Sequence, residues 1–209
     1  MITKYFKKFN KGGVLLLVLI VTLFVVSLGV FLSKNSRADA RLVLQTSPSI
    51  SVFADNLKPI YSNPAKLYSN AVRLNVSLID VGVLDDGSME TPKDWNTGGW
   101  FSRGAKAGEP GNLVINGHYD NNLGKPAAFW ELKNIKVGDK VYVLDELGKT
   151  YEYNVTQTFY VGIADPNRLQ IFNQDRSKSE ITLITCGGVW LASQHNYNQR
   201  LVVKGQLVE

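Results

Sequence analysis

The sequence is organised around two apolar runs, Ile181-Thr182-Leu183-Ile184-Thr185-Cys186 and Arg200-Leu201-Val202-Val203, which are separated by residues 187–199. We predict strands over 181–186 and 200–208, because both runs are apolar and rich in β-branched residues. If these strands pair antiparallel, Cys186 ends one of them near the point where Arg200 begins the other. Directly opposed residues in such a ladder have Cα atoms roughly 4.5–5.5 Å apart. A thiol and a guanidinium group are then expected at one rim of the sheet.

A third reactive side chain, that of His118, is also expected at the end of a strand. It comes shortly after the apolar run Leu113-Val114-Ile115, with Asn116-Gly117 between them. The segment 187–199 is long for a hairpin connection, and long loops in compact domains are often binding loops. We therefore expect His118, Cys186 and Arg200 to converge beside a binding loop.

These three residue types suit acyl transfer. A thiolate attacks a carbonyl carbon, and imidazole accepts a proton and later returns one to the leaving amine. Arginine stays cationic and donates to a developing oxyanion. Asp120, two residues past His118, is a candidate to orient the imidazole, although a solvated aspartate in a turn is the more common case.

Each residue also has an ordinary structural interpretation. Cys186 fits a buried, inert position at the end of an apolar strand, His118 fits a turn next to Gly117, and Arg200 fits an exposed surface position. His195 lies in a polar run that resembles a mobile loop, so we predict no catalytic role for it.

The rest of the chain from Ala71 onward predicts a mostly β domain. Strands are expected where apolar residues alternate with polar ones or form short runs between turn signals, over 72–78, 113–115, 140–144 and 150–161. Pro126 favours the start of a short helix whose apolar residues are Phe129, Leu132 and Ile135. Residues 163–179 are expected to form a long loop with one helical turn. Many short strands of this kind indicate a β-sandwich or a closed barrel.

The amino-terminal region predicts a membrane anchor. No charged residue interrupts 12–32, which at 1.5 Å per residue is long enough for a bilayer core of roughly 30 Å. The lysines within 1–11 favour a cytoplasmic amino end, and 33–70 is expected to be a stalk that carries the domain 71–209 outside the cell. Cleavage after a signal peptide at Ala38-Asp39-Ala40 is the alternative, but the apolar run is longer than a usual signal core.

Charge and cysteine content exclude several classes of function. Residues 1–41 hold seven of the 23 Lys and Arg and one of the 18 Asp and Glu, which leaves 16 bases and 17 acids in 42–209. Residues 42–209 are thus nearly neutral, and they do not provide the basic surface that binding to a nucleic acid requires. A single cysteine excludes an intramolecular disulfide and a cysteine-rich metal cluster. We expect no metal and no cofactor.

Three motifs together resemble the sortase family. Thr182-Leu183-Ile184-Thr185-Cys186 is similar to the family's Thr-Leu-x-Thr-Cys signature, Asn198-Gln199-Arg200-Leu201-Val202-Val203 to its arginine-bearing last strand, and Asn116-Gly117-His118-Tyr119-Asp120 to its histidine motif. Phe129-x-x-Leu132 and Val137-Gly138-Asp139-Lys140-Val141 also match the segment that follows the histidine. Each piece is weakly specific alone, whereas their order and spacing over about 72–208 are strongly specific.

The resemblance implies an eight-stranded β-barrel with short helices and a cysteine transpeptidase of the bacterial surface. Such an enzyme cuts a Leu-Pro-x-Thr-Gly-like sorting signal after its threonine and holds a thioacyl intermediate on Cys186. His118 would be the general acid and base, Arg200 would position the substrate and stabilise the oxyanion, and Thr185 would help to shape the substrate site. The implied partners are surface proteins with a sorting signal and an amine acceptor, either a cell-wall precursor or a pilin lysine.

Two other interpretations stay open at the level of sequence. One is another cell-wall Cys/His enzyme, such as an L,D-transpeptidase-like cross-linker or a peptidase, although the Ser-x-Gly-Cys pattern of the former is missing around Cys186. The other is a non-catalytic anchored β domain, in which Cys186 is inert and His118 has no chemical role.

Overall fold

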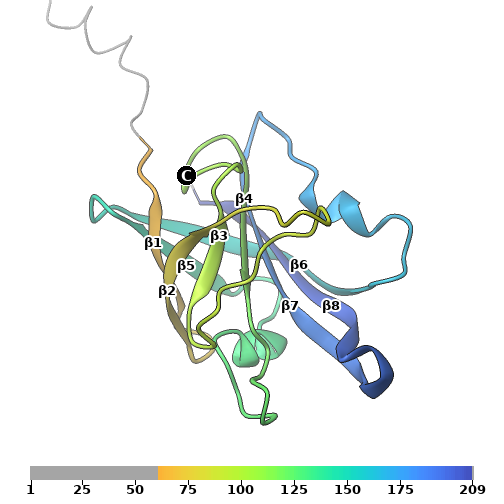
Figure 1. The fold of residues 1–209 in the computed structure, drawn as a ribbon. Coiled ribbons are helices and arrows are strands. Elements are labelled where there is room, and N and C mark those ends of the chain that lie inside the picture. Colours follow the sequence, from red (N-terminus) through yellow and green to blue (C-terminus); the bar gives the residue numbers. More distant parts are fainter. Residues whose placement is uncertain (1–60, 209) are drawn as a thin grey trace, which may run out of the picture. The chain divides into compact units, whose positions relative to one another are not determined.

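The computed structural model describes residues 61–208, and the strands of this part close into a barrel in the order β1-β2-β3-β4-β7-β8-β6-β5 (Figure 1). The strands are β1 (Pro64–Ser69), β2 (Leu74–Val81), β3 (Gly98–Phe101), β4 (Gly111–Gly117), β5 (Lys140–Asp145), β6 (Thr150–Gly162), β7 (Ser179–Leu191) and β8 (Asn196–Leu207). The expected eight-stranded closed barrel is confirmed. A sandwich is excluded because β1 pairs with β5 as well as with β2.

The predicted basic segment 1–11 and the predicted anchor 12–32 lie outside the described residues. Within residues 61–208, no helix is long and apolar enough to cross a membrane.

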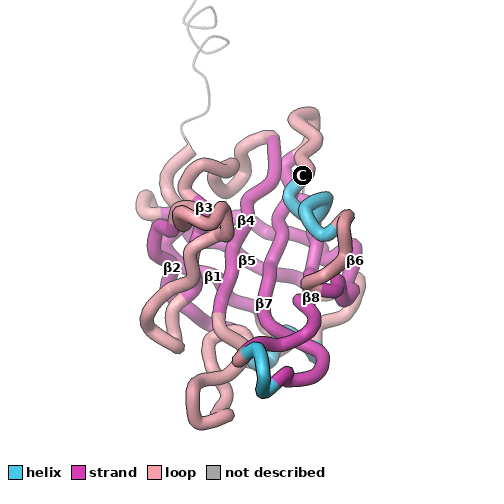
Figure 2. Tube along the Cα trace, turned by 45° about the vertical axis from the view of Figure 1, so that its right-hand side comes forward, coloured by secondary structure: helices cyan, strands magenta, loops and turns pink. Residues whose placement is uncertain are grey.

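Two of the ladders are parallel, β2 with β3 and β4 with β7, and the other ladders are antiparallel. The β4–β7 ladder matters most for function. Its register pairs Asn116 with Ile184, so β4 ends beside the interior of β7, which continues to Leu191. Figure 2 shows both strands in the barrel wall. A parallel pair needs a long crossover, which residues 118–178 provide.

The strands bury apolar side chains on both faces of this part of the wall. The barrel interior holds the larger cluster, in which Leu113, Ile115 and Leu183 are fully buried. The outer face of β4, β7 and β8 carries a second cluster formed by Val114, Ile184 and Val202, with Ile171 packed over them. Successive side chains of a strand point to opposite faces of the sheet. In β4, β7 and β8, the residues that face the barrel interior and those that face outward are therefore both apolar.

Part of the predicted stalk 33–70 belongs to the barrel, because β1 precedes Ala71. Leu67 is completely buried, whereas its neighbours Lys66 and Tyr68 are half-buried. Pro64 indicated a linker in the sequence but is the first residue of β1, a position where proline is tolerated. Ser69 likewise belongs to the fold, since its Oγ donates a 2.6 Å hydrogen bond to the carbonyl of Lys140.

The expected loop 187–199 is wrong for most of its length. β7 continues to Leu191 and β8 begins at Asn196, so that only the single turn η3 (Ala192–Gln194) and His195 separate them. The ladder shifts register between Gly187 and Trp190 and then resumes. Gly188 adopts a φ of 79° at this bulge, a left-handed conformation that glycine allows at little cost. The predicted strand ends at Cys186 and Arg200 are therefore wrong, because both residues lie inside strands and Gly187 and Gly188 form a bulge within a long hairpin.

The short helices are single 3₁₀ turns. η1 (Trp130–Asn134) lies where a helix from Pro126 is expected, although it starts later. Phe129, Leu132 and Ile135 are buried, and their spacing of three matches the three residues per turn of a 3₁₀ helix. η2 (Arg168–Phe172) is the helical turn expected within 163–179.

Candidate active site

Cys186 and Arg200 lie directly opposite each other in the β7–β8 ladder, as the sequence predicts. The parallel register of β4 and β7 pairs residues 68 apart, such as Asn116 with Ile184. His118 follows the last residue of β4, and continuation of this register places it beside Cys186. The thiol, the imidazole and the guanidinium therefore come from three adjacent strands.

All three side chains belong to the outer face of the barrel wall. Cys186 has the same parity along β7 as Ile184, and Arg200 has the same parity along β8 as Val202. Both Ile184 and Val202 belong to the outer apolar cluster. The candidate site is thus continuous with an apolar floor.

A groove of about 1110 Å³ covers this floor, and His118, Thr185, Cys186 and Arg200 all line it. Its walls come from the β2–β3 connection, which contributes Val83 to Thr91, and from the β6–β7 connection, which contributes η2. Figure 1 shows these two connections on the same side of the barrel as β7 and β8. The groove therefore runs over the outer apolar cluster and includes the thiol in its lining.

Burial raises the pKa of the Cys186 thiol above its ordinary value. The positive charge of Arg200 opposes this shift, whereas the negative charge of Asp120 adds to it. The net shift disfavours the thiolate form of Cys186. Nucleophilic attack then requires a base that accepts its proton.

The imidazole of His118 is held by the β2–β3 connection. Its Nε2 lies 2.7 Å from the carbonyl oxygen of Pro92, and its ring centroid is 4.3 Å from that of Trp95. A carbonyl oxygen only accepts, so Nε2 carries a proton. This contact leaves Nδ1 as the basic nitrogen of the neutral ring.

The guanidinium of Arg200 is oriented by its own hairpin. Nη1 donates to the carbonyls of Tyr197 and Gln199, at 3.1 and 3.0 Å, and Nη2 donates to Oδ1 of Asn196 at 3.0 Å. Arginine has five N–H donors. Nε and one Nη2 hydrogen have no acceptor among residues 61–208 and stay available to a substrate oxygen.

Thr185 is buried, and its hydroxyl donates a 2.7 Å hydrogen bond to the carbonyl of Gly117. This bond joins the residue before Cys186 to the residue before His118. Asp120 makes no hydrogen bond to His118 in the part of the chain that is described. Its Oδ2 accepts a 2.6 Å hydrogen bond from the hydroxyl of Tyr197 instead, so the orienting contact for which Asp120 was a candidate is not seen.

His195 also lines the groove, at the exposed tip of the β7–β8 hairpin. Its φ of 46° is left-handed, and its ring nitrogens have no hydrogen-bond partner within residues 61–208. We keep the prediction that it has no catalytic role.

Sequence reasoning missed the residues that hold the site together, Pro92, Trp95 and Tyr197. Tyr197 had a usable signal, since it lies three residues before Arg200 and therefore at the same end of β8. Pro92 and Trp95 had none, because they reach His118 from a connection whose path the sequence does not reveal.

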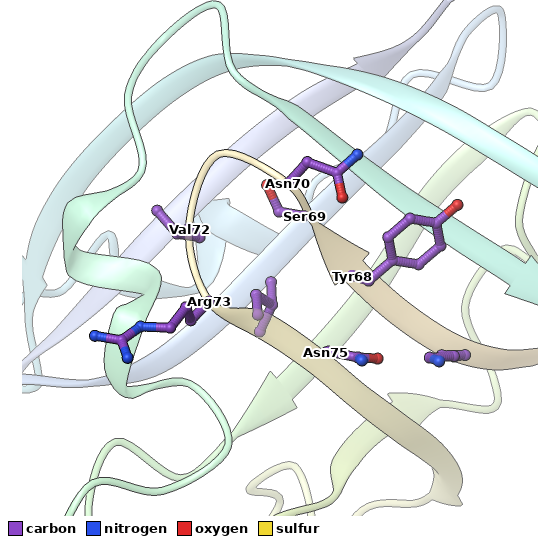
Figure 3. Close-up of a pocket in the computed structure, with 8 residues that line it drawn as sticks. Tyr68, Ser69, Asn70, Val72, Arg73 and Asn75 are labelled. Carbon is purple, nitrogen blue, oxygen red and sulfur yellow. The ribbon is translucent and has the colours of Figure 1, made fainter.

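A second pocket lies at the β1–β2 turn, away from these groups (Figure 3). It has a volume of about 540 Å³ and is lined by polar and basic residues that include Tyr68, Asn70, Arg73 and Asn75. It contains no cysteine, histidine or carboxylate. Within residues 61–208, no three His, Cys, Asp or Glu side chains are grouped to hold a metal ion.

Comparison with known proteins agrees with this arrangement. The chain is 37% identical over 98 residues to sortase A of Bacillus anthracis, an alignment that covers 47% of this chain and 41% of that protein. The chain thus matches less than half of the length of this relative.

Solved structures share the fold. A sortase D5 transpeptidase of Clostridium perfringens has a TM-score of 0.52 at 21% identity and covers 78% of this chain and 91% of that one. Sortase A of Corynebacterium diphtheriae has a TM-score of 0.55 at 20% identity, with coverage of 78% and 72%.

The sortase domain model matches residues 73–208, a range that includes β2 to β8 and all three of His118, Cys186 and Arg200. The chain therefore belongs to the sortase family.

Proposed function

We propose that this protein is a membrane-anchored cysteine transpeptidase that cuts a Leu-Pro-x-Thr-Gly-like sorting signal after its threonine and transfers the protein to an amine. The observation that carries the proposal is the direct pairing of Cys186 with Arg200, with His118 next to them in the parallel register. The surface location and the anchor rest on the apolar run 12–32 and the basic segment before it.

The sorting signal occupies the groove, in this proposal, with its apolar residues against the outer cluster of Val114, Ile184 and Val202. Burying one such side chain contributes about 1.5–3 kcal/mol. The threonine carbonyl then lies at Cys186. Thr185 shapes this end of the groove from below, because its hydroxyl joins β7 to the last residue of β4.

Acylation begins when His118 accepts the proton of the Cys186 thiol. The sulfur attacks the threonine carbonyl carbon, and the carbonyl π electrons move onto oxygen, where the free N–H groups of Arg200 donate to the oxyanion. The oxyanion then collapses, the C–N bond breaks, and His118 returns the proton to the departing amine. The result is a thioester between the threonine and Cys186.

Deacylation repeats these steps with the acceptor. The acceptor nitrogen attacks the thioester carbon and gives a proton to His118, the C–S bond breaks, and the sulfur of Cys186 takes a proton back. A new amide joins the surface protein to its acceptor, either a cell-wall precursor or a pilin lysine.

Mass spectrometry of the purified full chain with sorting-signal peptides tests this proposal. We expect an adduct on Cys186 with the mass of the acyl fragment, and a ligated product when a glycine-type amine is added. Cys186→Ala is expected to lose the adduct and keep the fold, with circular dichroism as the control. Turnover of the peptide by Cys186→Ala would exclude this mechanism.

A further inference from the structure

A row of aromatic side chains runs beyond the candidate site, outside the groove. Trp130 and Tyr119 lie with ring centroids 4.5 Å apart, Tyr119 meets Tyr197 edge to face at 5.7 Å, and Tyr197 meets Trp190 at 5.2 Å. None of these four residues lines the groove. Since Trp190 and Tyr197 pair in the distal part of the β7–β8 hairpin, the row lies past Cys186, on the side away from Ile184.

The row already accommodates one ammonium group. Nζ of Lys133 lies 3.3 Å from the ring centroid of Trp130 and 5.2 Å from that of Tyr119, and it donates to the Tyr119 hydroxyl at 3.1 Å. Aromatic faces attract cations through the ring quadrupole, by about 0.5–1 kcal/mol at exposed sites. The part of the row near Tyr197 has no such cation within residues 61–208.

An unpaired carboxylate lies at that part of the row. Oδ2 of Asp120 accepts from the Tyr197 hydroxyl at 2.6 Å, whereas Oδ1 has no hydrogen-bond donor and the carboxylate has no ion pair within the described part of the chain. Asp120 is half-buried and accessible. A carboxylate beside aromatic rings is a typical environment for a protonated amine.

Without a bound cation, the position of Asp120 is unfavourable for the reaction of Cys186. Its negative charge raises the pKa of the Cys186 thiol, so it hinders formation of the thiolate that attacks. A bound ammonium ion cancels this charge while the acceptor docks. It then gives one proton to His118, its nitrogen attacks the thioester carbon, and a second proton passes to the sulfur of Cys186 as the C–S bond breaks.

We propose that Asp120, held by the hydroxyl of Tyr197, whose ring contacts those of Tyr119 and Trp190, binds the acceptor amine as an ammonium ion. This inference rests on the proposed transpeptidase function and names a residue that determines the specificity of its second step. The two ends of the subsite follow His118 and precede Arg200, so an amine bound there reaches the thioester from the side opposite the groove.

The experiment compares two nucleophiles with the full-length protein. At pH 7 the terminal amine of triglycine is mostly cationic, whereas hydroxylamine is neutral. Asp120→Asn is expected to raise KM for triglycine about tenfold or more, because it removes a charge-assisted interaction. The same variant is expected to leave the rate with hydroxylamine and the formation of the thioacyl adduct undiminished.

Two further variants complete the test. Tyr197→Phe keeps the ring but releases Asp120, and we expect a smaller rise in KM for triglycine. Glu146→Gln removes an exposed carboxylate at the β5–β6 turn and is expected to change neither nucleophile. An unchanged KM for triglycine in Asp120→Asn, or an equal loss with both nucleophiles, would overturn the inference. Absence of any thioacyl adduct in the wild-type protein would overturn the proposed function itself.

Discussion

The hydroxyl of Thr185 donates a 2.7 Å hydrogen bond to the carbonyl of Gly117, and this bond joins β7, which carries Cys186, to the last residue of β4, which His118 follows. Both partners are buried. A buried carbonyl that loses its donor costs about 1–3 kcal/mol. The bond therefore contributes to stability and also sets the distance between thiol and imidazole.

Thr185→Val tests this link, since valine keeps the shape of threonine and removes the hydroxyl. We expect the free energy of unfolding to fall by about 1–3 kcal/mol and kcat for peptide cleavage to fall more than KM rises. Urea unfolding and steady-state kinetics measure the two effects. Thr185→Ser keeps the hydroxyl and is expected to restore most of the activity; equal activity in all three proteins would contradict the link.

The electrostatics of Cys186 predict opposite effects for its two charged neighbours. Arg200→Gln removes a positive charge that lowers the thiol pKa, so less thiolate forms at a given pH. We expect alkylation of Cys186 by iodoacetamide at pH 8 to slow about fivefold or more, which corresponds to about 1 kcal/mol of charge interaction. Asp120→Asn is expected to speed the alkylation of Cys186.

Because burial raises the pKa of the Cys186 thiol, the alkylation rate of the wild-type protein should still be rising with pH at pH 9. A plateau below pH 8 would contradict this view.

We expect Trp95 to affect catalysis by positioning the imidazole of His118. Its ring lies against the imidazole and is partly exposed, so its removal changes the site more than the core. We expect Trp95→Ala to reduce kcat about tenfold by freeing the imidazole from the Pro92 carbonyl, and Trp95→Phe to keep most of the activity. The histidine NMR signal of His118 provides the structural readout. Full activity of Trp95→Ala would show that the contact has no positioning role.

Gly117 is a packing constraint directly before His118. A Cβ at this position would lie 2.6 Å from Cδ1 and 2.8 Å from Cγ of Phe129, which is fully buried. Overpacking of this kind costs about 1–3 kcal/mol. We expect Gly117→Ala to lower the melting temperature and the activity together. Gly124→Ala is a control for crowding, because a Cβ there meets no atom within 4 Å, although its φ of 68° adds some strain of its own.

The pairing of Cys186 with Arg200 was predictable from the sequence alone, because two β-branched runs at the end of a chain favour an antiparallel pair. The position of His118 after a buried strand was predictable for the same reason. The sequence did not reveal that β4 and β7 are parallel neighbours, since 61 residues of crossover, 118–178, separate them. That pairing brings His118 to Cys186.

The sequence by itself determined the types of the reactive side chains and the apolar runs that carry or precede them, because alternation and apolar runs are local properties of the chain. It did not determine where the strands end, since Cys186 and Arg200 lie inside β7 and β8. Only the tertiary structure decided what holds those side chains. Pro92 and Trp95 reach His118 from the β2–β3 connection, and Asp120 bonds to Tyr197 from a segment 77 residues away. Such contacts depend on how the barrel closes and on where Gly187 and Gly188 bulge the hairpin, and closure is a property of all the ladders together rather than of any one segment.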